Sequence, residues 1–210
     1  MALDPSARRH LSRDPVMRGL MRAAGRCTLA PERGRSPYEA LIRAIAHQQL
    51  TGKAASTILS RFFALYGDGR FPEPAELLAT DDARLRAAGF SRAKVASLKD
   101  IAARTLDGTV PPRRALSRLR DEAIIERLTA VRGVGRWTVE MFLMFTLARP
   151  DVLPVDDYGV RSGFRLAYGL DELPRPRELA EFGLRWAPYR SAAAWYLWRA
   201  VDLHRAGAAK

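Results

Sequence analysis

The feature that most constrains this chain is a glycine turn between two apolar helical segments, with a pair of carboxylates close behind it. Residues 128–158 read LTAVRGVGRWTVEMFLMFTLARPDVLPVDDY. We expect one helix to end near Val131 and a second to run from about Arg136 to just before the next proline, because glycine and proline end helices. A short apolar loop then brings Asp156 and Asp157 to the start of a third helix.

The turn has the composition of an anion-binding site. Two glycines, Gly133 and Gly135, allow positive φ and close approach of another molecule to the backbone. The amides of Val134, Gly135 and Arg136 would then stand free at a helix N-terminus, which favours a phosphate. The last carbonyls of the preceding helix would stay unpaired and could hold a cation. Many helical hairpins carry such a turn for packing alone. In this chain, the carboxylate pair and the net positive charge favour a functional role.

The charge balance indicates a polyanionic partner. The chain has 35 basic and 23 acidic residues, a net charge of +12 and a sequence pI near 10.7, as expected of a nucleic-acid-binding protein. Arginine, alanine, glycine and proline are abundant, which a GC-rich genome also produces, but such a bias does not explain the sign of the imbalance. The single cysteine, Cys27, excludes a disulfide framework or a cysteine-ligated cluster within the chain and suits a reducing compartment.

Apolar periodicity predicts helices throughout the chain. No segment alternates with period two for long enough to form a strand, so we expect an all-α fold. No apolar run approaches the ~20 residues of a membrane span, and the first 15 residues lack a signal core, so we expect a soluble, cytoplasmic protein. Residues 1–13 are expected to fray. The predicted helices cover Pro15–Ala24, Tyr38–His47, Lys53–Tyr66, Ala75–Ala79, Asp82–Ala87, residues 92–105 capped by Ser91, a segment starting at Asp121 or Glu122, and Tyr189–His204.

Several blocks in one order resemble the helix-hairpin-helix DNA glycosylases. They are AIAHQQLTGKAA (44–55), LxxVxGVGRWTVE, VDDY, and RWAPYRSAAAWYLW (185–198), and they are most similar to the alkylation-repair branch, the 3-methyladenine DNA glycosylase II family. The resemblance covers roughly residues 37–200. It implies two helical lobes with a central cleft, formed by residues 37–149 and by residues 1–36 plus 150–210. It also implies that the N-terminal β-domain of longer relatives is missing.

The resemblance assigns different roles to the two adjacent carboxylates. Asp157, directly before Tyr158, matches the catalytic position, and Asp156 matches the helix-capping position. From the sequence alone, an aspartate at such a place is most often simply an N-cap, and one in the first turn offsets the helix dipole. A carboxylate there suits electrostatic stabilisation of a cationic transition state.

The resemblance implies a base pocket with walls formed by four residues. Trp137 and Trp198 match pocket tryptophans, whereas Met141 stands where the family has an aromatic residue and predicts a pocket with less stacking. Trp186 and Trp195 are expected in the core. The proposed pocket comprises Trp137, Met141, Tyr158 and Trp198.

The resemblance also implies two sets of DNA-contacting residues. A wedge loop, Gln48, Gln49 and Leu50, would fill the gap left by a flipped base, and the sequence leaves open which side chain does so. The hairpin would hold a phosphate, and three backbone carbonyls match those that hold a monovalent cation in relatives. The implied hairpin contacts are Gly133, Val134, Gly135, Arg136 and Thr138; the implied cation ligands are Thr129, Val131 and Val134.

Together these residues imply a monofunctional glycosylase. Relatives with lyase activity carry a Schiff-base lysine at the position of Trp137, and iron–sulfur relatives need four cysteines near the C-terminus, which this chain lacks. We expect a monomer that excises alkylated, cationic purines from double-stranded DNA without a required cofactor. The alternative is a non-catalytic helix-hairpin-helix DNA-binding module. An enzyme for oxidised or mismatched bases is disfavoured by the missing lysine and cysteines.

Overall fold

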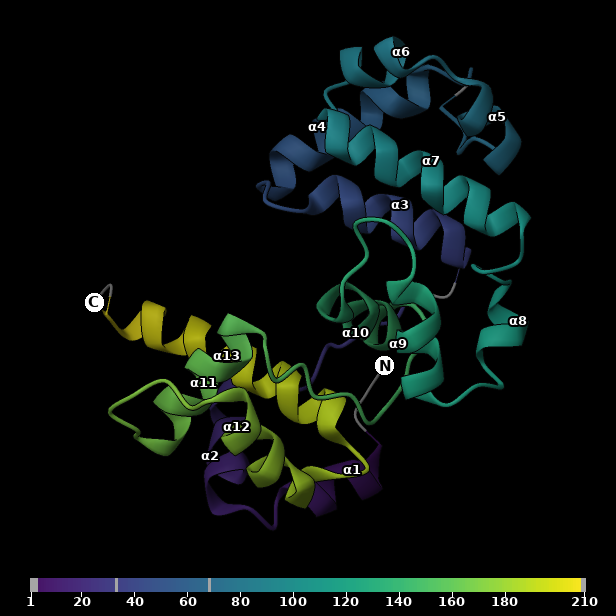
Figure 1. Cartoon of the computed structure of the whole chain (residues 1–210). Coiled ribbons are helices and arrows are strands. Elements are labelled where there is room, and N and C mark those ends of the chain that lie inside the picture. Colours follow the sequence, from purple (N-terminus) through teal and green to yellow (C-terminus); the bar gives the residue numbers. More distant parts are fainter. Residues whose placement is uncertain (1–3, 33, 68, 209–210) are drawn as a thin grey trace. The chain divides into compact units, whose positions relative to one another are not determined.

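All regular structure in the described residues is helical, which confirms the predicted all-α class. The structure is a computed structural model that describes residues 4–32, 34–67 and 69–208 (Figure 1). No helix in these ranges is long and apolar enough to cross a membrane. The chain divides into two compact units, one of residues 1–32 and 143–210 (unit 1) and one of residues 33–142 (unit 2). The division falls inside helix α10, Arg136–Phe145.

Unit 2 is built around the long helix α7, Arg92–Leu106, which packs against α3, α5 and α6. Ser91 caps α7 as predicted, since its hydroxyl accepts a hydrogen bond from the Lys94 amide at 3.2 Å. Phe62 and Leu98 are fully buried in its core. The other helices of unit 2 are α3 (Pro37–His47), α4 (Gly52–Ala64), α5 (Pro74–Ala79), α6 (Asp82–Ala87), α8 (Arg113–Leu116) and α9 (Asp121–Thr129).

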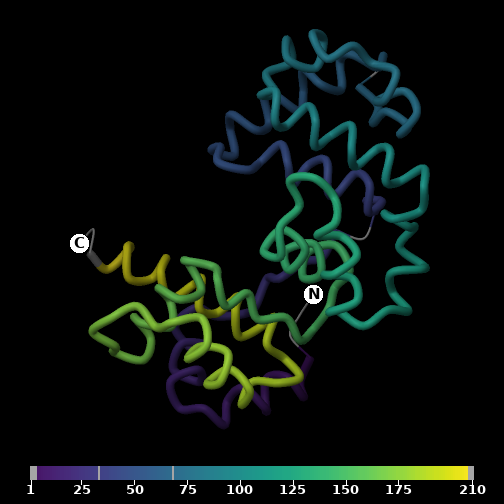
Figure 2. The backbone as a smooth tube through the Cα atoms, in the orientation of Figure 1, coloured from purple at the N-terminus to yellow at the C-terminus, as the bar shows by residue number. Residues whose placement is uncertain are grey.

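Unit 1 is built around the C-terminal helix α13, Arg190–Ala208, which packs against both α11 and α2. The first and last parts of the chain therefore lie side by side, as the purple and yellow segments of Figure 2 show. The apolar side chains of α13 form much of this core: Ala193, Ala194 and Leu197 are fully buried. The other helices of unit 1 are α1 (Pro5–Leu11), α2 (Pro15–Ala24), α11 (Tyr158–Tyr168), α12 (Pro176–Gly183) and the short 3₁₀ helix Leu184–Trp186.

Asp14 ties three elements of unit 1 together. Its Oδ1 caps α2 by accepting hydrogen bonds from the amides of Val16 and Met17. Its Oδ2 accepts hydrogen bonds from the Tyr168 hydroxyl at 2.5 Å and from Trp186 Nε1 at 3.2 Å. Burial opposes its charge, but these hydrogen bonds prevail and hold the pKa of Asp14 below its usual value. This carboxylate therefore fixes α2 against α11 and the 3₁₀ helix.

The expectation that residues 1–13 fray is wrong for Pro5–Leu11, which forms α1, whereas residues 1–3 lie outside the described residues. The Asp4 side chain accepts a hydrogen bond from the Ser6 amide at 2.8 Å, and Pro5 occupies the first helical position. An aspartate followed by proline is a recognised helix start, so the sequence carried this signal. Buried Ala7 and Leu11 supply the inward face of the helix.

We predict opposite effects for two glycines in helices of unit 1. A Cβ at Gly163 of α11 would overlap the backbone carbonyl of Leu197 in α13, whereas a Cβ at Gly19 of α2 would meet nothing within 4 Å. Gly163→Ala should lower the free energy of unfolding by about 1–3 kcal/mol, and Gly19→Ala should raise it by about 0.5–1 kcal/mol through helix propensity. Urea denaturation of the two variants measures this. Unchanged stability in Gly163→Ala would contradict the close α11–α13 packing.

Candidate active site and nucleic-acid interface

Asp157, at the start of α11 in unit 1, receives two hydrogen bonds on one carboxylate oxygen. Its Oδ1 accepts from the Val160 amide at 2.7 Å and from Trp198 Nε1 of α13 at 2.9 Å. The first bond comes from the N-terminus of α11, where the helix dipole favours a negative charge. The second hydrogen bond holds the carboxylate against the indole of Trp198 in α13. The carboxylate therefore has a defined orientation set by two different elements.

Asp157, and not Asp156, is the N-cap of α11, so the expected division of roles between them is wrong on this point. Asp157 has the extended backbone of a cap, with φ −68° and ψ 120°. Asp156 lies one residue earlier in a turn closed by the hydrogen bond from the Asp157 amide to the Pro154 carbonyl, and its side chain is exposed. A side chain at that place precedes the cap position and is not the one bonded to the third helical amide, so it cannot replace the cap.

Gly159 makes the contact between Asp157 and Trp198 possible. A Cβ at this position would lie 2.9 Å from Trp198 Cδ1 and 3.1 Å from Asp157 Oδ1, which is closer than carbon atoms normally approach. The glycine after the D-D-Y motif is therefore a structural part of the site. Gly159 is not among the predicted site residues, although its place directly after the motif is a signal that the sequence contains.

A second aromatic ring lies beside Trp198. Phe145, the last residue of α10 and part of unit 1, stacks on Trp198 with ring centroids 6.1 Å apart and an interplanar angle of 26°. Phe145 is 36% exposed, and Tyr158 at the start of α11 is 74% exposed. Phe145 is not among the predicted site residues, because it ends an apolar run that resembles core. Trp186 and Trp195 are buried as expected.

The first turn of α10, in unit 2, exposes Trp137. This side chain is 46% exposed, while Val139 and Phe142 on the opposite stripe are buried. Met141, one turn further on, is half-buried. One side of α10 therefore packs in the core, and another side carries the large aromatic side chain of Trp137 to the surface.

Only one of the two hairpin glycines has the backbone that requires glycine. Gly133 has φ +78°, and a Cβ there would overlap Ser97 Oγ of α7. Gly135 does not have a positive φ, and a Cβ there would meet nothing within 4 Å. The expectation of positive φ at both positions is thus wrong for Gly135. Close approach of another molecule is the remaining reason for a glycine there.

One further expectation about the hairpin is wrong, and two of the expected DNA contacts have side chains that pack or pair within unit 2. The Val134 amide is not free, since it donates to the Val131 carbonyl at 3.1 Å, and its side chain is buried. Thr138 is only 5% exposed, so its side chain packs inside unit 2. Arg136 donates to Glu122 at 3.2 and 2.7 Å and to Glu140 at 3.2 Å. The hydrogen bond to Glu122 raises the pKa of Arg136. Because Glu122 lies in α9, the same contact connects α9 to α10.

The wedge loop is tied to the hairpin within unit 2. Gln48 ends α3, and its Nε2 donates to the Gly133 carbonyl at 3.0 Å. Lys94 Nζ donates to the carbonyls of Ala46 at 3.0 Å and Gln48 at 2.8 Å, and burial lowers the pKa of this amine. Gln49 has φ +56° and is exposed, and Leu50 is 40% exposed. Gln48 therefore positions the loop, while Gln49 and Leu50 project from it.

The carbonyls of Thr129, Val131 and Val134 lie along the end of α9 and the turn. The Val131 carbonyl accepts the Val134 amide, which leaves its second lone pair for another donor or a cation. Elsewhere in the described ranges, histidine, cysteine and carboxylate side chains form no group of three or more that could hold a metal ion.

Comparisons with known proteins agree with these features. Residues 42–188 match the family described as HhH-GPD superfamily base excision DNA repair protein. The chain is 46% identical over 169 residues to DNA-3-methyladenine glycosylase 1 of Schizosaccharomyces pombe, covering 80% of this chain and 74% of the relative.

Two solved structures share the fold at substantial sequence identity. The Schizosaccharomyces pombe 3-methyladenine DNA glycosylase in complex with abasic DNA matches with a TM-score of 0.83 and 43% identity, covering 92% of this chain and 95% of that chain. A DNA-3-methyladenine glycosidase of Bacillus halodurans matches with a TM-score of 0.84 and 34% identity, covering 94% and 89%. The chain belongs to the HhH-GPD superfamily of base excision DNA repair proteins.

Proposed function

We propose that the protein is a monofunctional DNA glycosylase that hydrolyses the N-glycosidic bond of alkylated, cationic purines in duplex DNA. The observation that carries this proposal is the Asp157 carboxylate, held by the α11 N-terminus and by Trp198 Nε1 beside a stacked aromatic pair. The relatives named as 3-methyladenine glycosylases support the same activity. The protein acts as a monomer, in the cytoplasm, and requires no cofactor.

Asp157 supplies the charge that the reaction needs. Breaking an N-glycosidic bond builds positive charge on the deoxyribose, and a fixed carboxylate stabilises that charge and orients or deprotonates the attacking water. Normal purines leave poorly unless protonated, whereas N3- or N7-alkylated purines already carry a positive charge. One carboxylate is therefore sufficient for these substrates without a separate general acid.

Aromatic rings supply the selectivity for cationic bases. Stacking and cation–π attraction to each favourable ring contribute about 1–2 kcal/mol. In unit 1 the exposed edge of the Phe145–Trp198 stack and the exposed Tyr158 provide such rings next to Asp157. Trp137 and Met141 keep their proposed role as base-contacting residues by motif matching, and a methionine offers weaker stacking than an aromatic ring.

DNA binding uses unit 2. The backbone of the hairpin binds a phosphate through the amides at the start of α10, and a monovalent cation on the carbonyls of Thr129, Val131 and Val134 bridges turn and phosphate. Gln49 and Leu50 fill the space of the flipped base. Gln48 and Lys94 fix the loop that carries them, so these two residues act on DNA binding only indirectly.

Asp157→Asn should abolish most of the excision activity while leaving the fold intact. Asparagine is also a good N-cap, and its Oδ1 can still accept hydrogen bonds from Val160 and Trp198, so only the charge is lost. Single-turnover release of free base from methylated duplex DNA should slow by ~10²–10³-fold. Asp156→Asn is the matched control, since that side chain is exposed and caps nothing, and it should cost little.

Release of free base by Asp157→Asn at the wild-type rate would contradict the catalytic role of Asp157. Absence of any base release by the wild-type protein, together with tight duplex binding, would favour the non-catalytic DNA-binding module instead. Products should be abasic strands that stay uncleaved until alkali is added, because Trp137 cannot form a Schiff base.

The two hairpin glycines should respond differently to substitution. Gly133→Ala should destabilise the protein by about 1–2 kcal/mol, because it strains a left-handed backbone and overlaps Ser97. Gly135→Asp should leave the fold stable but weaken DNA binding, because a Cβ there meets nothing within 4 Å and the added carboxylate repels a phosphate. Thermal melting and DNA titration at two salt concentrations separate these effects.

The titration of Gly135→Asp should use an undamaged duplex and one with an abasic analogue. Equal losses on both are expected, because phosphate contacts position a protein without reading bases. A loss restricted to the abasic duplex would place this turn in the lesion site and contradict its role as a phosphate anchor.

A further inference from the structure

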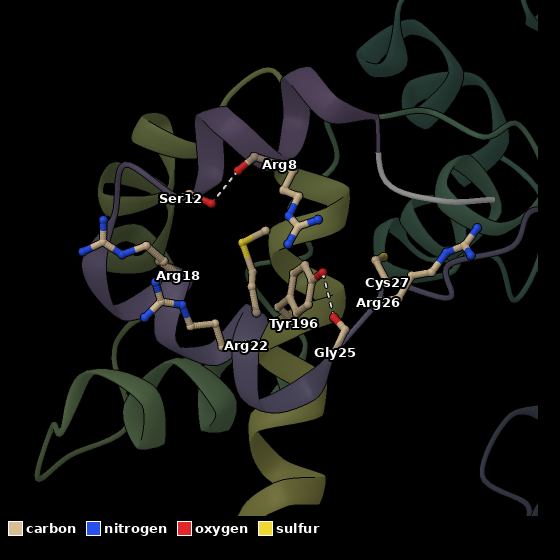
Figure 3. Close-up of a pocket in the computed structure, with 9 residues that line it drawn as sticks. Arg8, Ser12, Arg18, Arg22, Gly25, Arg26, Cys27 and Tyr196 are labelled. Atoms are coloured by element: carbon tan, nitrogen blue, oxygen red, sulfur yellow. Dashed lines mark hydrogen bonds between the residues drawn. The ribbon is translucent and has the colours of Figure 1, made fainter.

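Unit 1 contains a cavity of about 660 Å³ on the side of α2 that faces α1 and α13 (Figure 3). Its walls include Met21 and the ring of Tyr196, whose hydroxyl donates to the Gly25 carbonyl at 3.2 Å. This hydrogen bond and the packing of α13 on α2 fix the floor of the cavity. The site that contains Asp157 shares none of these residues.

Four arginines line this cavity: Arg8, Arg18, Arg22 and Arg26. No carboxylate is among the lining residues. All four side chains are exposed, and within the described ranges none forms an ion pair or a side-chain hydrogen bond. Since like charges held together without counter-charges raise the electrostatic potential of a cavity, this arrangement attracts anions.

Helix stabilisation explains only part of this cluster. Arg8 and Arg22 lie in the last turns of α1 and α2, where a positive charge interacts favourably with the helix dipole. Arg18 lies in the middle of α2 and Arg26 lies beyond its end, so neither gains from that effect. The concentration of all four on one cavity needs another explanation.

The arrangement suits several phosphates better than one. Guanidinium groups bind phosphate oxygens with paired hydrogen bonds. Figure 3 shows Arg18 and Arg22 on one side of the cavity, Arg26 on the other, and Arg8 between them. Charges spread in this way match the successive phosphates of a nucleic-acid backbone and do not converge on one phosphoryl group.

We propose that the arginine-lined cavity of unit 1 binds the phosphodiester backbone of DNA, as a second contact separate from the hairpin of unit 2. This inference rests on the proposed function in so far as DNA is the polyanion. The contact adds affinity for any duplex and carries no lesion specificity, because the cavity offers charge and no groups arranged to read a base.

The test compares two double variants that remove the same charge from unit 1. Arg18→Gln/Arg22→Gln removes two cavity arginines, and Arg13→Gln/Arg205→Gln removes two exposed arginines that do not line the cavity. Fluorescence anisotropy measures the Kd for an undamaged and an abasic-analogue duplex across a salt series. Thermal melting verifies that both variants are folded.

The cavity variant should bind both duplexes on the order of ten-fold or more weakly at 0.1 M salt, and its salt slope should fall by about 1.8, as for two lost phosphate contacts. The control should change Kd by less than about two-fold. The excision rate at saturating enzyme should stay that of the wild type, which separates this result from any failure of the proposed activity. Equal effects of the two variants, or no effect of either, would overturn the proposal.

Small phosphate compounds provide the second arm of the experiment. Calorimetry with ATP and with pyrophosphate should detect only weak binding, in the millimolar range and equally salt-sensitive. Micromolar binding of ATP that is lost in Arg18→Gln/Arg22→Gln while DNA affinity is unchanged would identify a nucleotide pocket and contradict the backbone contact.

Discussion

The candidate active site depends on one hydrogen-bonded carboxylate, that of Asp157. Asp157 is the N-cap of α11, and the same carboxylate oxygen that caps the helix accepts a hydrogen bond from the indole N–H of Trp198. Three features make this pair of hydrogen bonds possible. They are the turn before α11, the absence of a side chain at Gly159, and the packing of α13 against α11 at Gly163. On the proposed function, a cap that stabilises the helix also fixes the charge that glycosidic bond cleavage requires, so stability and catalysis would share the same contact.

The turn between α9 and α10 depends on a different constraint, the left-handed backbone of Gly133. The Gly133 carbonyl accepts a hydrogen bond from Gln48 Nε2, and the absence of a side chain at Gly133 leaves room for Ser97 of α7. The loop that follows α3 and the turn that precedes α10 are therefore held by the same few contacts. A substitution in either one should disturb both. Arg136, which the resemblance implies as a hairpin contact to DNA, has a guanidinium group that connects α9 to α10 through Glu122.

The sequence predicted the fold well and the site in part, and the differences have physical reasons. Helical periodicity placed α2 and α6 with their observed ends, because caps and apolar spacing agree there. Two adjacent aspartates satisfy the same capping pattern, so only the backbone geometry could show that Asp157 is the cap. Phe145 is an apolar residue at the end of an apolar run, and its contact with Trp198 comes from residues far apart in the chain. Periodicity contains no information about such contacts.

The role of the Asp157–Trp198 contact is tested most directly by Trp198→Phe. This variant keeps an aromatic ring beside Phe145 but removes the N–H that orients the carboxylate, together with one ring of the indole. The measurement is the single-turnover rate constant for release of 7-methylguanine from duplex DNA, with Kd for an abasic-analogue duplex determined in parallel. The account predicts a rate roughly ten-fold or more below wild type, in line with loss of a hydrogen bond to a charged group, with little change in Kd. A rate equal to that of the wild type would contradict it.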